Sequence, residues 1–83
     1  MVERRHMTLD EIDLAAAFTG MVFRPCSRPE RMARTFAARV HPDHPDRPMY
    51  LQISEAEARV LRNIAWRFRR QLPATLRPTE RPT

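Results

Sequence analysis

The stretch SEAEARVLRNIAWRFRRQLP, Ser54 to Pro73, predicts the longest helix of the chain and decides how the rest packs. Its first four residues fit a capping box, in which the hydroxyl of Ser54 accepts from the third amide of the helix and Glu57 accepts from the amide of Ser54. We expect the helix to run over residues 55–72. One face has apolar residues at helical spacing and is expected to be buried. These residues are Val60, Leu61, Ile64, Ala65, Phe68 and Leu72.

Trp66 falls far from this apolar face. On a helical wheel with residues 100° apart, it lies about 165° from the middle of the face. A large apolar ring among cations is unusual on a solvated surface, because burial of such a ring is favourable. The polar residues that surround Trp66 and complete the candidate binding face are Arg59, Arg62, Asn63, Arg69 and Arg70.

Three interpretations of Trp66 stay open. In the first, the first helix or the region of Leu76 covers the ring, and arginine stems lie on it. In the second, bases stack on the ring while the arginines neutralise phosphates. In the third, the same face docks on an acidic protein, since tryptophan and arginine are frequent anchors of protein interfaces.

Two other helices are predicted by the same start signal. The segments TLDE (8–11) and SRPE (27–30) both fit a capping box. We expect helices over residues 9–19 and 28–40, with Gly20 ending the first. The expected core residues are Leu9, Ile12 and Phe18 from the first helix, Phe36 and Val40 from the second, and Leu61, Ile64 and Phe68 from the third.

The segment between the second and third helices mixes two signals. Residues 41–48 contain three prolines, which predicts a stiff loop without helix or strand. The apolar stretch MYLQI, residues 49–53, predicts a short strand, and residues 21–23 are its expected partner. The prediction is therefore a mainly α fold, a small single domain of three helices with one or two short β-strands.

The chain has 83 residues, which allows one domain. We place that domain at residues 8–72. Residues 1–7 are expected to form a flexible N-terminus, and residues 73–83 a flexible proline-rich tail with little apolar content.

All fifteen basic residues are arginine, and with ten acids they give a formal net charge of +5. Guanidinium groups stay charged and present a flat fork of donors that suits phosphate and carboxylate. The balance favours an anionic partner, either nucleic acid (DNA or RNA) or an acidic protein surface. Arg31, Arg34 and Arg39 lie off the apolar stripe of the second helix and form a secondary basic face.

Several classes of function lack their signatures. Cys26 is the only cysteine, so no internal disulfide forms and a cytoplasmic location is expected. No apolar run approaches about 18 residues, and no apolar region follows the charged N-terminus, so neither a membrane span nor a signal peptide is expected. A single glycine leaves no phosphate-cradling loop. We predict no enzyme activity and no cofactor; a thiol nucleophile at Cys26 is the less favoured alternative.

The repeat HPDHPD, residues 41–46, offers nitrogen and oxygen ligands close together, but its prolines hold the side chains apart and no metal site is predicted. The run from ARV into HPD resembles the J-domain of Hsp40 co-chaperones. That resemblance implies that His41-Pro42-Asp43 stimulates an Hsp70 ATPase and that the secondary basic face meets the chaperone. The doubled motif and the intervening MYLQI depart from the J-domain pattern.

The stretch from Ser54 to Pro73 also resembles the C-terminal helix of small arginine-rich proteins of phages and mobile elements in GC-rich bacteria, a group that implies no particular activity. The leading hypothesis from the sequence is a small, basic, non-enzymatic module that binds nucleic acid through the arginine and tryptophan face. The alternative is a phage- or mobile-element-type interaction protein or inhibitor that docks on an acidic partner through the same face.

Overall fold

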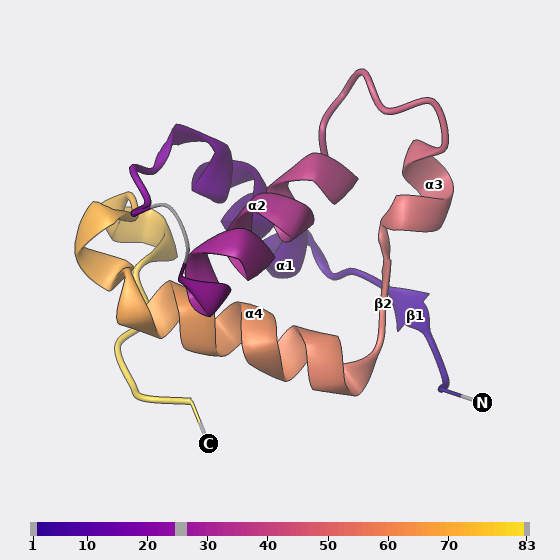
Figure 1. Cartoon of the computed structure of the whole chain (residues 1–83). Helices are drawn as coiled ribbons and strands as arrows, with labels where there is room; N and C mark the ends of the chain where they lie inside the picture. Colours follow the sequence, from indigo (N-terminus) through magenta and orange to yellow (C-terminus); the bar gives the residue numbers. More distant parts are fainter. Residues whose placement is uncertain (1, 25–26, 83) are drawn as a thin grey trace.

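The computed structural model describes residues 2–24 and 27–82, so Cys26 lies outside the described residues. The fold is mainly helical, with one small sheet, as predicted. Figure 1 shows α4 along one edge of the molecule with α2 beside it. The elements in chain order are β1 (Arg5–His6), α1 (Leu9–Ala17), η1 (Phe18–Gly20), α2 (Arg28–Arg39), α3 (Arg47–Tyr50), β2 (Gln52–Ile53), α4 (Glu55–Arg67), η2 (Arg69–Gln71) and η3 (Ala74–Leu76).

The helix starts follow the predicted caps. Thr8 and Ser54 both form complete capping boxes, at the starts of α1 and α4. At the start of α2 the box is half formed: the Ser27 hydroxyl accepts from the amide of Glu30 at 3.3 Å, but no return bond is made. The caps satisfy amides that have no partner within the helix, which fixes where each helix begins.

The helix ends differ from the prediction. α4 ends at Arg67, and Phe68 leaves helical geometry as its C-cap before the short 3-10 turn η2. The ring of Phe68 lies edge-on to Phe23 with centroids 5.2 Å apart, and the amide of Val22 donates to the side chain of Gln71 at 3.0 Å. The segment predicted to pair with the MYLQI strand therefore packs on the end of α4 instead.

The sheet has a different partner and a shorter strand than expected. β1 pairs antiparallel with β2, and Arg5 lies opposite Ile53. The prediction of a strand over 49–53 is wrong in its first half, because Arg47–Tyr50 form the single helical turn α3. Pro48 lies in the first turn, where its missing amide leaves no helical hydrogen bond unmade, so the proline permits the turn.

Residues 2–7 contact the rest of the chain and so depart from the expectation of a flexible N-terminus. Besides the strand pair, the amide of Met7 donates to the carbonyl of Leu51 at 2.7 Å. The side chain of Met7 is only 7% exposed and belongs to the core. The buried side chain of Met7 and the backbone hydrogen bonds to residues 51–53 together hold this segment in place. Figure 1 shows β1 beside β2, the strand that leads into α4.

The core lies between α1, α2 and α4. The predicted core positions Phe18, Phe36, Val40, Leu61 and Ile64 are buried. Two predicted positions are wrong: Leu9 is 79% exposed and Val60 is 37% exposed.

Leu9 is exposed because α1 turns Glu11 and Ala15 toward the interior instead. Ala15 is fully buried, and a side chain this small lets neighbouring helices approach closely. The carboxylate of Glu11 can be buried because the guanidinium of Arg5 donates hydrogen bonds to it.

The C-terminal segment is folded back in part. η3 packs against α1, and Arg77 donates to the carbonyl of Leu72 at 3.0 Å. No helix of the described ranges 2–24 and 27–82 has the length and apolar content that crossing a membrane requires.

Candidate functional site

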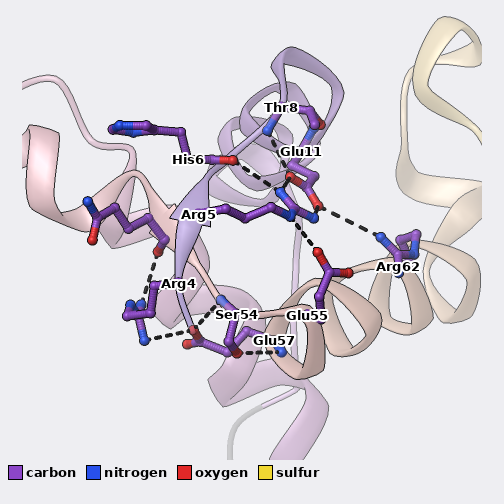
Figure 2. Close-up of polar contacts among 10 residues, drawn as sticks. Arg4, Arg5, His6, Thr8, Glu11, Ser54, Glu55, Glu57 and Arg62 are labelled. Carbon is purple, nitrogen blue, oxygen red and sulfur yellow. Dashed lines mark hydrogen bonds and ion pairs between the residues drawn. The ribbon is translucent and has the colours of Figure 1, made fainter. Parts of the chain in front are cut away.

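An ion-pair network joins β1 to α1 and α4 (Figure 2). Arg5 donates two parallel hydrogen bonds to the buried carboxylate of Glu11, from Nη1 to Oε1 at 2.8 Å and from Nη2 to Oε2 at 2.9 Å. Arg5 also donates to Glu55. The amide of Thr8 donates to the same Glu11 carboxylate at 2.8 Å. The bonds from Arg5 outweigh burial and lower the pKa of Glu11 from 4.5 to about 2.

The pKa of Glu11 predicts how stability depends on pH. Because the folded-state pKa lies below the unfolded value, the stabilisation is complete above about pH 4.5 and is lost as the pH falls toward 2. We expect Glu11→Gln to lower the free energy of unfolding near pH 7 by on the order of 2 kcal/mol, a figure discounted for the partial exposure of Arg5. Urea unfolding between pH 2 and pH 7 measures this.

The matched control is Glu3→Gln, which changes an exposed carboxylate of the same segment. Its stability should match the wild type at every pH. A Glu11→Gln variant with an unchanged slope of stability against pH between 4.5 and 2 would contradict the role of the Arg5–Glu11 pair.

Ion pairs within the chain involve two of the predicted binding arginines, one in this network and one at Glu57. Arg62 approaches Glu11 at 3.7 Å, and Arg39 binds Glu57 at 2.6 Å. Their charges are partly compensated by carboxylates of the same chain, which these arginines share with Arg5 and Arg4. Arg31 and Arg34, the rest of the predicted secondary basic face, are exposed on α2.

A hollow of about 610 Å³ opens beside α4, between the start of α2 and the C-terminal segment, and Trp66 is part of its wall. The indole is half-buried, neither covered nor free on the surface. We call this feature the Trp66 hollow. Its lining consists of Arg28, Pro29, Met32, Val60, Asn63, Ile64, Trp66, Arg67, Arg69 and Arg81.

The charge of the Trp66 hollow has one sign. Its four arginines come from the start of α2, the end of α4, η2 and the C-terminal segment, and the lining holds no carboxylate. Within residues 2–24 and 27–82, none of these four arginines forms an ion pair, in contrast to the network around Glu11. Their close placement gives the hollow a positive potential, which favours an anion.

Arg69 lies directly over Trp66. Its guanidinium carbon is 4.1 Å from the ring centroid, and its Nη1 donates to the carbonyl of Trp66 at 2.8 Å. This cation–π contact covers one region of the indole with a group that is itself flat and charged. Leu76, which was one expected cover for the ring, lines a separate hollow with Arg62 and Leu14.

The sequence-predicted face is divided by the structure. Asn63, Trp66 and Arg69 meet in the Trp66 hollow. Arg59 and Arg70 are exposed but do not line it, and Arg62 faces α1.

Sequence reasoning missed Arg28, Arg67 and Arg81 as members of the site. Only Arg67 carried a usable signal, since it follows Trp66 directly on the same helix. Arg28 and Arg81 reach the hollow through tertiary packing, which a helical wheel does not contain.

The HPDHPD repeat forms two successive turns. The imidazole Nδ1 of His41 accepts from the amide of Asp43 at 3.3 Å, and that of His44 accepts from the amide of Asp46 at 3.3 Å. The two imidazoles thus accept hydrogen bonds from the backbone two residues further on, and these bonds stabilise the turns. In the described part of the chain, no three histidine, cysteine or acidic residues gather as a metal site would need.

Comparison of the chain with models of protein families, with curated proteins and with solved structures finds no match.

Proposed function

We propose that the protein is a small non-enzymatic module that binds nucleic acid, with little sequence readout, through the Trp66 hollow. The observation that carries the proposal is the composition of that hollow: an indole wall and four arginines free of ion pairs within the described residues, without a carboxylate in the lining. Aromatic rings stack on bases of any identity, and arginines bind the phosphates between them.

The distribution of ion pairs supports this choice of surface. Arg4, Arg5, Arg39 and Arg62 are held by Glu11, Glu55 and Glu57. Three carboxylates thus compensate one group of four arginines. The other eleven arginines outnumber the other seven acids by four, and they include the four at the hollow.

Binding is expected to depend strongly on salt. If the four arginines of the hollow each neutralise one phosphate, log K falls against log salt with a slope of roughly −3 to −4. The variant Arg28→Ala/Arg67→Ala should flatten the slope by about 1.5, because two phosphate contacts are lost. Trp66→Ala should weaken binding by about fivefold or more, since a stacked base contributes about 1–3 kcal/mol. Fluorescence anisotropy of a labelled oligonucleotide, titrated at several salt concentrations, measures both.

The matched control is Arg59→Ala/Arg70→Ala, which removes the same charge from exposed positions outside the hollow. It should reduce affinity less than Arg28→Ala/Arg67→Ala does. Circular dichroism verifies that each variant is folded. Equal losses from the two double variants would assign binding to net charge alone, and no loss from Trp66→Ala would remove the indole from the site.

A further inference from the structure

We infer that the Trp66 hollow admits an unpaired base, so that the module selects single-stranded nucleic acid over duplex. The inference rests on the proposed function and names the ligand more closely. Its basis is the position of the indole, which is half-buried in a concave wall and not displayed on a ridge. A base can reach this ring only by leaving its own stack.

The shape of the hollow argues against recognition of a duplex. Reading a duplex directly requires a convex element, such as a helix that projects into a groove about 12 Å wide. Here the Trp66 side of α4 is flanked by Pro29 and Met32 of α2 and by Arg81 of the C-terminal segment. Because these neighbours line the hollow together with Trp66, we expect a rigid duplex to be unable to bring its stacked bases against the indole.

The size of the hollow suits one nucleotide. Its volume of about 610 Å³ lies within the range of roughly 300–1,000 Å³ that is typical of small-molecule sites. Met32, Val60 and Ile64 give the lining apolar side chains, whereas the arginines supply the charge. An apolar interior with charged groups around it matches a nucleotide, whose base is flat and weakly polar and whose phosphates are anionic.

Arg69 covers part of the Trp66 ring when no ligand is bound. The guanidinium over Trp66 makes a cation–π contact with the ring, and its Nη1 donates to the carbonyl of Trp66. A base that stacks on this region of the indole takes the place of the guanidinium. The displaced guanidinium then stands beside the nucleotide, where its fork of donors suits the phosphate.

The experiment uses the full chain and the fluorescence of Trp66, which is the only tryptophan. Three probes of equal length are titrated at constant salt: an unstructured single strand, a duplex, and a single strand whose sugars lack bases. We expect the single strand to bind at least tenfold more tightly than the duplex and to quench Trp66. The abasic strand should bind no better than the duplex and leave the fluorescence unchanged.

Two variants complete the test. Trp66→Ala, followed by anisotropy, should remove the preference for the single strand and leave duplex affinity within about twofold. Trp66→Phe should retain most of the preference, because it keeps a ring in the wall. Equal affinity for single strand and duplex, or equal quenching by the abasic strand, would overturn the inference and leave nucleic-acid binding intact. Absence of binding to all three probes would instead end the proposed function.

Discussion

Removal of residues 2–6 combined with Met7→Ala, so that the starting methionine no longer stands directly before Thr8, is expected to abolish cooperative folding. This variant takes away the buried side chain of Met7, which contributes about 1.5–3 kcal/mol, together with the pairing of β1 and β2. It also leaves the buried carboxylate of Glu11 with only the more distant Arg62, 3.7 Å away, and loss of the two bonds from Arg5 is destabilising. A chain of this length has roughly 4–12 kcal/mol of stability in total, so these losses together consume a large share of it. Urea unfolding followed by circular dichroism measures the change.

The matched control shortens the same end without touching its contacts. Deleting only Val2 and Glu3, both exposed, should leave the unfolding midpoint nearly unchanged. A cooperative transition of wild-type midpoint in the longer deletion would show that the segment is dispensable and that the core closes without Met7.

Phe36→Ala is expected to have the second largest effect, a loss of about 3–5 kcal/mol in the free energy of unfolding. Phe36 is 1% exposed and belongs to the core between α1, α2 and α4. Truncation removes the apolar ring and leaves a cavity that the neighbouring elements fill only in part. The guanidinium of Arg39, 5.5 Å from the ring centroid, also loses its contact. Chemical unfolding at neutral pH gives the value.

Two further variants sharpen this measurement. Arg34→Ala changes an exposed residue of the same helix and should alter stability by no more than about 0.5 kcal/mol. Phe36→Leu keeps most of the volume and should cost less than Phe36→Ala. A loss below about 1 kcal/mol for Phe36→Ala would mean that α2 does not depend on this ring for its packing.

The helical part of the fold was predictable because its signals are local. The hydroxyl and carboxylate of a capping box lie three residues apart, so Thr8 and Ser54 mark helix starts without knowledge of the rest of the chain. The strand Arg5–His6 has only two residues and no periodicity, so its pairing arises only from Gln52–Ile53 and the burial of Met7. Tertiary contacts of this kind override local patterns.

The candidate site was predictable to the extent that one helix determines it. The wheel placed Asn63, Trp66 and Arg69 near one another, and they meet in the Trp66 hollow. The wheel also placed Arg62 with them, but in the structure Arg62 points toward α1, where it lies 3.7 Å from the carboxylate of Glu11. Arg81 joins the hollow because the C-terminal segment folds back, which a proline-rich composition gives no reason to expect.

The pairing of β1 with β2 has a consequence for how the protein is made. On the ribosome, Arg5 and Met7 emerge long before Gln52, Ile53 and the start of α4 have been translated. Contacts between distant parts of a chain form slowly, because a large loop must close first. The side chain of Met7 therefore stays uncovered in the nascent chain until the residues of β2 and the start of α4 have left the exit tunnel.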